Sequence, residues 1–467
     1  MSRTRIAALV AVGVAAVIGL TAALVIVGKD GDAAGGASGT CRDSASTRVP
    51  QPTGAQLAAA GLARLPLASD DARVDLVAPP FSNPTEVSNP LFPIGSLRSA
   101  LLNGTVDGQP FRTETTLLPE TRIMEWSEGQ CVEVLVSQYT AYLGGRIHEV
   151  ALDLYAQADD GSVWYFGEDV FNYEDGVIAD TAGTWFAGIE GPAAMIMPGE
   201  PKVGDAYRPE NIAGFVFEEV TVKAVGRTVA GPRGPVQGAI TTRELHDDGT
   251  TEEKTFAPGY GEFFTSGGGD VEALALAVPT DALSGGVPPA LEKLSSGADD
   301  VFVAASAGGR LWSQASPAPS RMSDAWATHR RTGDVPPRLV APTNEALRNL
   351  ARRVAGRDRA GSRQAALDAA QAVLDLQLQY RPVAEIDLGR FDIWLRQVVL
   401  DAQARAHGAL LGDVSTLEWM RDRIEKALDP VDLTRLDTLL KELRTNAGDE
   451  DFAGASETAV EMRKLLA

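Results

Sequence analysis

Histidine and cysteine are scarce in this sequence, whose 467 residues include four histidines and two cysteines. No histidine lies at a zinc-ligand spacing from another histidine or a cysteine, and neither His-Glu-x-x-His nor Cys-x-x-Cys occurs. The motifs Gly-x-Ser-x-Gly, Gly-x-x-x-x-Gly-Lys-Ser/Thr and Gly-x-Gly-x-x-Gly before a helix are also missing. The sequence therefore predicts no metal site and no cofactor. It favours a non-catalytic protein and leaves an enzyme open.

Positive charge is also in short supply, because 42 lysines and arginines stand against 63 aspartates and glutamates, for a net charge of -21. Such a chain repels phosphates rather than neutralising them, which disfavours a general binder of nucleic acid or of anionic membranes. The simplest interpretation of the charge is solubility. The alternative is that the charge attracts cations.

One long apolar run occurs at the N-terminus, where residues 6–27 follow the basic residues Arg3 and Arg5. The apolar core of a secretory signal spans about 7–15 residues, and a membrane-spanning helix needs about 20. The length favours an uncleaved anchor at 1–28 over a cleaved signal, although Ala33, Ala34 and Ala37 would suit a peptidase. The positive-inside bias then predicts a single-pass protein of the cell membrane with most of the chain extracytoplasmic. The protein is secreted if the segment is cleaved.

Two cysteines, Cys41 and Cys131, fit an oxidising compartment. They are predicted to form one disulfide that ties the start of the exported chain to the β-domain. Lipid modification of Cys41 is the competing hypothesis. It is disfavoured because the polar, glycine-rich stretch 29–40 separates this cysteine from the apolar run.

Strand and helix signals occupy different parts of the chain. Between residues 105 and 261, runs of β-forming residues alternate with short turns such as Asp175-Gly176 and Asp248-Gly249, which indicates an antiparallel meander. After residue 343, apolar residues recur at helical spacing. We predict an α+β protein whose sheet is a barrel, a half-barrel or a strongly curved sheet. Its parts are an anchor or signal (1–28), a flexible tether (29–80), an antiparallel β-domain (81–277), a proline-rich connector (278–342) and a helical bundle (343–467).

The β-domain is organised around a strand with three consecutive aromatic residues, Trp164, Tyr165 and Phe166. Side chains alternate between the two faces of a strand, so this strand is apolar on both faces. Each face must be covered by a second layer or must line a hollow. The predicted ligand-binding residues are Trp164, Phe166, Glu168, Trp185 and Phe186.

Acidic residues cluster beside these aromatics, and paired carboxylates next to aromatic rings are typical of glycoside hydrolases. Glu168 and Asp169 are adjacent on a strand, so they point to opposite faces and cannot flank one bond. No catalytic residue is predicted. The favoured hypothesis is binding of an apolar or amphipathic envelope molecule, a lipid, glycan or peptide, by the β-domain. The alternatives are a scaffold that docks an envelope protein through the helical bundle and a glycan-acting hydrolase.

Several short segments carry a resemblance to a known family: Tyr155-Ala156-Gln157, Asp160-Gly161, Val163-Trp164-Tyr165-Phe166-Gly167-Glu168-Asp169, Gly183-Thr184-Trp185 and Ala257-Pro258-Gly259-Tyr260-Gly261. Together they resemble an uncharacterised family of bacterial secreted and membrane-attached proteins of unknown function. The resemblance covers roughly residues 89–261. It implies export and a β fold, and it implies no reaction. Ile94-Gly95-Ser96 departs from the pattern, which has a glycine-proline pair at the first strand.

Overall fold

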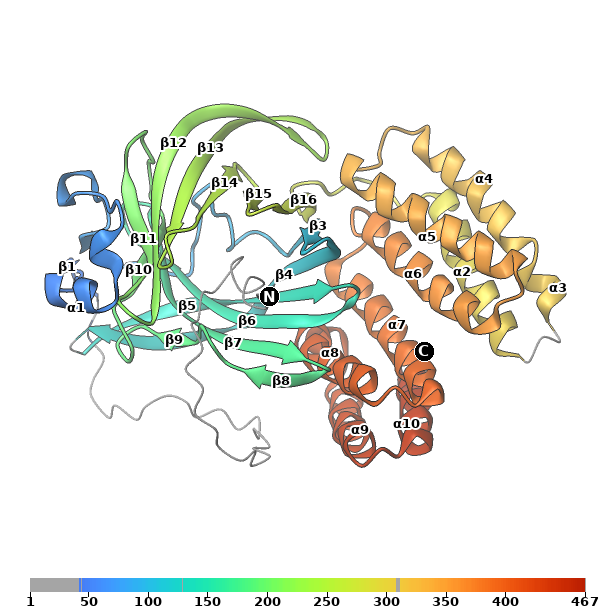
Figure 1. Cartoon of the computed structure of the whole chain (residues 1–467). Coiled ribbons are helices and arrows are strands. Elements are labelled where there is room, and N and C mark those ends of the chain that lie inside the picture. The colour runs from blue at the N-terminus through green and yellow to red at the C-terminus, as the bar shows by residue number, and fades with distance from the viewer. Residues whose placement is uncertain (1–41, 43, 128, 308–310, 467) are drawn as a thin grey trace.

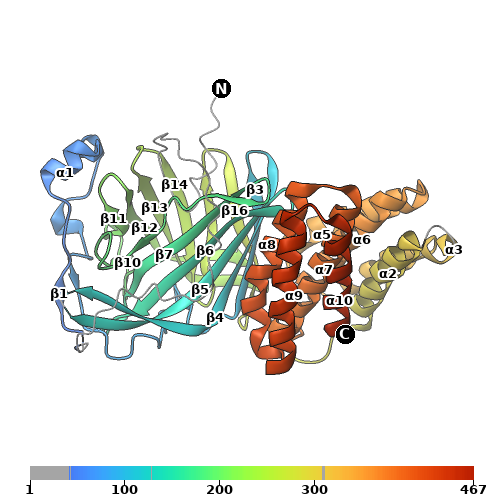
Figure 2. The same ribbon diagram turned by 90° about the horizontal axis from the view of Figure 1, so that it is seen from below.

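A computed structural model describes residues 42, 44–127, 129–307 and 311–466 (Figures 1 and 2). The predicted anchor at 6–27 and Cys41 lie outside the described residues. Within the described part of the chain, no helix is both long enough and apolar enough to cross a membrane. The structure confirms an α+β protein with an antiparallel sheet followed by a helical region.

The β-domain is one 14-stranded antiparallel sheet in the order β10-β7-β6-β5-β4-β3-β16-β15-β14-β13-β12-β11, with β8 and β9 paired to β7. Its strands are β3 (Ser99–Val106), β4 (Gln109–Ser127), β5 (Gln130–Leu143), β6 (Arg146–Gln157), β7 (Val163–Glu174), β8 (Val177–Asp180), β9 (Trp185–Phe186), β10 (Ala194–Met197), β11 (Ala206–Ile212), β12 (Val216–Gly231), β13 (Gly234–His246), β14 (Thr251–Ala257), β15 (Gly261–Gly267) and β16 (Asp270–Val278). The sheet is strongly curved, and its end strands β10 and β11 lie beside each other (Figure 1). This curvature gives the sheet an inner and an outer face.

The segment before the sheet packs against it. It contains the two-stranded sheet of β1 (Thr47–Arg48) and β2 (Val77–Ala78), the helix α1 (Gly54–Ala59) and the short 3-10 helices η2 (Leu62–Arg64) and η3 (Asp70–Ala72). Farther along, the ring of Phe81 contacts those of Trp164 and Phe166 on β7, with centroids 6.5 and 5.5 Å apart. This segment therefore covers one face of the strand on which the sequence placed three consecutive aromatics.

The other face of β7 also bears a buried ring. Tyr165 is stacked on Tyr155 at 4.9 Å and meets Trp185 edge-on at 5.5 Å. Tyr165 and Tyr155 are directly opposite each other in the register of β7 and β6, so both point inward. The strand is therefore covered on both faces, with Trp164 and Phe166 outward and Tyr165 inward.

The predicted connector at 278–342 carries α2, α3, α4 and the start of α5. The helices are α2 (Pro289–Ser306), α3 (Trp312–Ala315), α4 (Ala318–Arg330), α5 (Pro337–Ala355), α6 (Arg359–Gln377), α7 (Val383–Ala404), α8 (His407–Ile424), η4 (Glu425–Ala427), α9 (Pro430–Gly448) and α10 (Phe452–Leu465). Prolines at the first positions of α2 and α5 are compatible with helix, since the first turn needs no backbone N–H bond. The helices lie against one side of the sheet, where α8 contacts β4, β6 and β8 (Figure 2).

The predicted disulfide stays a prediction, because Cys41 lies outside the described residues. Its neighbour Arg42 lies beside the other cysteine. The Arg42 N–H donates to the Gly129 carbonyl at 2.8 Å, and the Cys131 N–H donates to the Arg42 carbonyl at 3.3 Å. The chain on which Cys41 is carried therefore reaches the start of β5.

Candidate functional site

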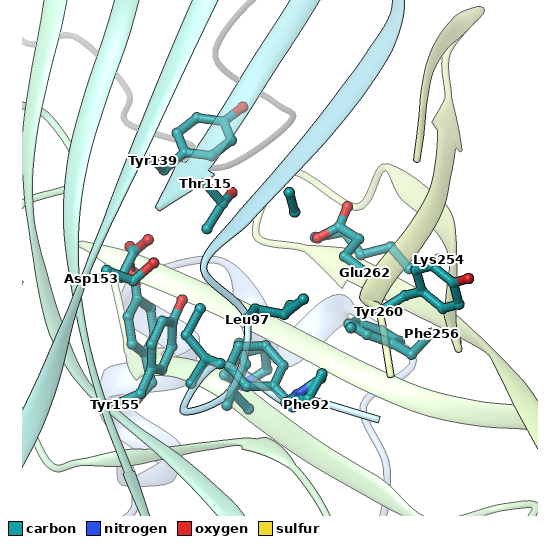
Figure 3. A pocket seen from close by; sticks show the side chains of 18 of the residues that line it. Phe92, Leu97, Thr115, Tyr139, Asp153, Tyr155, Lys254, Phe256, Tyr260 and Glu262 are labelled. Atoms are coloured by element: carbon teal, nitrogen blue, oxygen red, sulfur yellow. Dashed lines mark hydrogen bonds between the residues drawn. The ribbon is translucent and has the colours of Figure 1, made fainter. Parts of the chain in front are cut away.

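The inner face of the sheet encloses a cavity of about 170 Å³, lined by β3 to β7, β10 to β16 and the segment 92–97. Its apolar part is made by aromatic and aliphatic side chains, among them Phe92, Leu97, Tyr155 and Phe256 (Figure 3). Thr115, Tyr139, Lys254 and Glu262 also line it and are half-buried. A cavity of about 150 Å³ accepts a benzene ring, so this one takes a small molecule or one end of a longer one.

The cavity is acidic. Its lining includes six carboxyl groups against a single lysine and no arginine. The carboxyls belong to Asp153, Glu210, Glu218, Glu244, Glu262 and Glu272, and the lysine is Lys254. Buried carboxylates normally need paired cations, so this excess of acid distinguishes the cavity from an ordinary protein interior.

Strand register gathers one group of these acids. Glu244 and His246 are two residues apart on β13, so they share the inner face. His246 is directly opposite Glu218 on β12, and Glu244 is directly opposite Glu252 on β14. Cross-strand partners have their Cβ atoms only about 5 Å apart, which brings these side chains into contact.

Distances within this group define two ion pairs. His246 Nδ1 lies 3.1 Å from Glu218 Oε1, and Lys254 Nζ lies 2.7 Å from Glu244 Oε2. On the other side of the imidazole, Nε2 lies 3.9 Å from Glu252 Oε2, too far for a hydrogen bond. Glu218, Glu244 and His246 each offer one ligand atom within 4.8 Å of the others, which is a geometry that could hold a metal ion.

The protonation of this group follows from burial and charge. Burial lowers the pKa of His246, but the hydrogen bond and charge of Glu218 outweigh it and raise the pKa to about 9. Burial raises the pKa of Glu244 to about 8, and the nearby Glu218 carboxylate adds to this shift. We call this group the acidic corner; its members are Glu218, Glu244, His246, Glu252 and Lys254. Near neutral pH it contains a cationic imidazole, a cationic lysine and several carboxyl groups that compete for these two cations.

A second group of acids comes from β6, β15 and β16. Asp153 accepts a hydrogen bond from the Tyr165 hydroxyl at 2.7 Å, and Glu272 accepts one from the Thr113 hydroxyl. Burial raises the pKa of Asp153 to about 7. Burial, reinforced by the Glu262 carboxylate, raises the pKa of Glu272 to about 8. Neither Asp153 nor Glu272 has a cation in hydrogen-bond contact among the described residues, so burial favours the protonated form of both.

Glu168 faces inward because β7 contains a bulge. Asp153 pairs with Glu168 and Tyr155 pairs with Tyr165, so three residues on β7 span two on β6. The extra residue is accommodated at Gly167, whose φ of +121° is accessible only to glycine and where a Cβ would lie 2.1 Å from the Trp185 carbonyl oxygen. Strict alternation would have turned Glu168 outward with Trp164 and Phe166.

Glu168 is 1% exposed, and neither of its oxygens accepts a hydrogen bond from an N–H or hydroxyl group of the described residues. Burial and the neighbouring Glu210 carboxylate hold its pKa well above the usual range. The pKa of Glu210 is also raised, by burial first and by Glu218 next. These two carboxyls stay together because at least one of them carries a proton.

The five predicted ligand-binding residues do not form one groove. Trp164, Phe166 and Trp185 are buried in the hydrophobic core, and Phe186 is partly buried against it. None of the five lines the cavity, whereas Tyr165 between two of them does. Sequence reasoning missed the acids of β11 to β16, for which the local signals were the alternating pairs Glu244-x-His246 and Glu252-x-Lys254.

Comparison of the sequence with models of known protein families and with curated proteins finds no match. The resemblance carried by residues 89–261 therefore stays an expectation, and the functional argument rests on the cavity.

Proposed function

We propose that this protein is a non-catalytic binding protein whose β-domain takes a small amphipathic molecule with a positively charged group into the interior cavity. The observation that carries the proposal is the lining, in which six carboxyl groups face one lysine beside a wall of aromatic rings. An apolar body fits against the rings, and an ammonium group offers the charge that the carboxyls lack. This is also the cation-attracting alternative for the net charge of -21.

Size supports a small ligand. The cavity of about 170 Å³ holds a ring or a short alkyl chain, and not the two acyl chains of a membrane lipid. A longer envelope molecule would place only one end inside. The ligand class is thus narrower than the lipid, glycan or peptide expected from the sequence.

Hydrolysis receives less support from the arrangement of the acids. A glycosidase separates its two carboxyls by about 5 Å or more to admit the scissile bond. Glu168 instead neighbours Glu210 and is not among the residues that line the cavity. These two carboxyls therefore do not face each other across a space that could admit a glycosidic bond. A scaffold role would need an apolar stripe on the bundle, and the exposed large apolar residues described there are single valines, Val303, Val431 and Val460.

The proposal also includes the cellular location of the protein. We infer that residues 6–27 anchor the chain in the cell membrane and that Cys41 and Cys131 form a disulfide on its outer side. The contacts of Arg42 beside Cys131 support the pairing. Mass spectrometry of the non-reduced protein tests the pairing. A peptide linking the two cysteines is expected, and a free thiol or a lipid at Cys41 would contradict the pairing.

Calorimetric titration with two probes of equal length tests the ligand class. Hexylammonium should bind the full chain at pH 8, and hexanoate should not. Asp153→Asn combined with Glu272→Gln should weaken hexylammonium binding at least tenfold. The matched control Glu253→Gln, an exposed acid beside Glu252, should leave binding unchanged. Equal affinity for the two probes, or for the double variant and the control, would overturn the proposal.

A further inference from the structure

We propose that Glu218, Glu244 and His246 form a binding site for a divalent transition-metal ion of the Zn²⁺ or Mn²⁺ kind, on the wall of the cavity formed by β12 and β13. This site is separate from the Asp153 and Glu272 group to which the organic cation is assigned. It does not depend on that ligand. Imidazole together with carboxylate is a donor set that suits these ions, whereas Ca²⁺ and Mg²⁺ prefer oxygen alone.

The geometry is close to that of a bound ion. The three ligand atoms lie within 4.8 Å of one another. Ligands at about 2.0–2.2 Å from a tetrahedral ion lie about 3.5 Å apart, so closure requires movements of about 1 Å. The backbone that carries them is held by strand pairing, since Glu218 and His246 are cross-strand partners and Glu244 is two residues from His246. Only side-chain rotation is needed.

A second observation points to a ligand here. His246 Nε2 and Glu252 Oε2 are buried and make no hydrogen bond within the described residues, although they face each other at 3.9 Å. The side chains of His246 and Glu252 are 2% and 8% exposed. A metal-bound histidine almost always donates its other N–H to a carboxylate or carbonyl. An ion at Nδ1 would fix Nε2 as the N–H donor, and Glu252 already stands where the acceptor is needed.

Charge supports an ion rather than ion pairs alone. The pairs Glu218–His246 and Glu244–Lys254 neutralise two carboxylates, which leaves Glu210 and Glu252 without a cation in hydrogen-bond contact among the described residues. Binding a divalent ion displaces the imidazole proton, so two positive charges enter and one leaves. The corner gains one positive charge where carboxylates are in excess.

Titration of the metal-free full chain with ZnCl₂ and MnCl₂, without any organic ligand, tests the site. One ion per chain should bind in the wild-type protein. His246→Gln and Glu218→Gln should each weaken binding at least a hundredfold, and Glu252→Gln should weaken it about 10- to 100-fold, as outer-shell partners do. The matched controls His148→Gln and Glu253→Gln should bind as the wild type does.

Folding is checked on the same samples by thermal unfolding without metal. Each variant should unfold cooperatively, and only the wild type and controls should gain thermal stability when Zn²⁺ is added. The double variant Asp153→Asn, Glu272→Gln should bind Zn²⁺ normally while its binding of hexylammonium is weakened, which separates failure of this site from failure of the cavity ligand. Absence of stoichiometric binding by the wild type, or equal binding by a folded His246→Gln variant, would overturn the proposal. The pairs with Glu218 and Lys254 would then be the whole role of this corner.

Discussion

The two faces of the same sheet treat buried charge in opposite ways. On the outer face, under α6, α7 and α8, three carboxylates meet three guanidinium groups, and each carboxylate contacts at least two of them: Glu114, Asp375 and Asp387 with Arg112, Arg390 and Arg423. On the inner face, six carboxyls line the cavity with one lysine, and the imidazole of His246 pairs with one of them, Glu218. The first arrangement is balanced, and the second is not.

The pKa values of the carboxyl groups on the two faces are shifted in opposite directions. Burial raises the pKa of Glu114, but Arg112, Arg390 and Arg423 outweigh it and hold the pKa well below the usual range. Burial raises the pKa of Glu272 to about 8, because the hydrogen bond from Thr113 and the charge of Lys254 do not outweigh it. The outer network joins the sheet to the helices without a ligand. The inner one is complete only with protons or bound cations, which is why we assign the function there.

The largest expected effect that sharpens this comparison is the change of the protein's stability with pH. The folded-state pKa values of Asp153, about 7, and Glu272, about 8, lie above those of the unfolded chain, so their stabilising contribution is present at low pH and is lost as pH rises through these values. At about 1.4 kcal/mol per unit, the free energy of unfolding should fall by on the order of 5 kcal/mol between pH 5 and 8. Urea unfolding at both pH values measures it.

The double variant Asp153→Asn, Glu272→Gln is the control for that prediction. Neutral amides cannot ionise, so most of the fall should disappear. A wild-type protein equally stable at pH 5 and 8 would mean that the inner carboxyls are not buried as described.

The next largest effect is expected from removing one guanidinium group from the balanced ion-pair network on the outer face. Arg390→Met leaves Glu114, Asp375 and Asp387 with fewer cations in a dry interface and should cost about 3–5 kcal/mol. Denaturant unfolding followed by tryptophan fluorescence measures the loss. Arg348→Met removes an exposed pair with Glu345 and should cost less than about 1 kcal/mol. Equal losses would show that the network is as solvated as the exposed pair.

The smallest expected effect is the difference in stability between two variants that each lose one acid, on the neighbouring strands β11 and β12. Glu210→Gln on β11 removes a carboxyl that neighbours Glu168 and Glu218, and should stabilise the protein at pH 8 by about 1 kcal/mol. Glu219→Gln on β12 removes a carboxylate to which the Arg208 guanidinium donates two hydrogen bonds at 3.0 Å. It should destabilise by about 1–3 kcal/mol. Thermal unfolding shows whether the signs differ, and the same sign for both would contradict the contrast.

Local sequence patterns predicted those features of the fold that are determined within a single strand. Three consecutive aromatics at residues 164–166 required cover on both faces, and the structure provides it with Phe81 outside and Tyr155 inside. The sequence could not tell which face borders the cavity, and it could not reveal the bulge at Gly167 that turns Glu168 inward. These depend on neighbouring strands.

The acidic corner escaped prediction for a related reason. Glu218 and His246 are 28 residues apart and meet only because the register of β12 and β13 shifts at irregular points along the hairpin. Part of the predicted proline-rich connector is helical, and its prolines at residues 289 and 337 lie in the first turns of α2 and α5.

Native mass spectrometry of the protein isolated gently from its own membrane tests the central claim most directly. We predict a bound small molecule that is cationic in solution, present in the wild-type protein and in Glu253→Gln, and lost in the Asp153→Asn, Glu272→Gln variant. A wild-type protein that has bound an anionic lipid, or that has bound nothing while its inner carboxyls titrate at ordinary pKa values, would contradict the account.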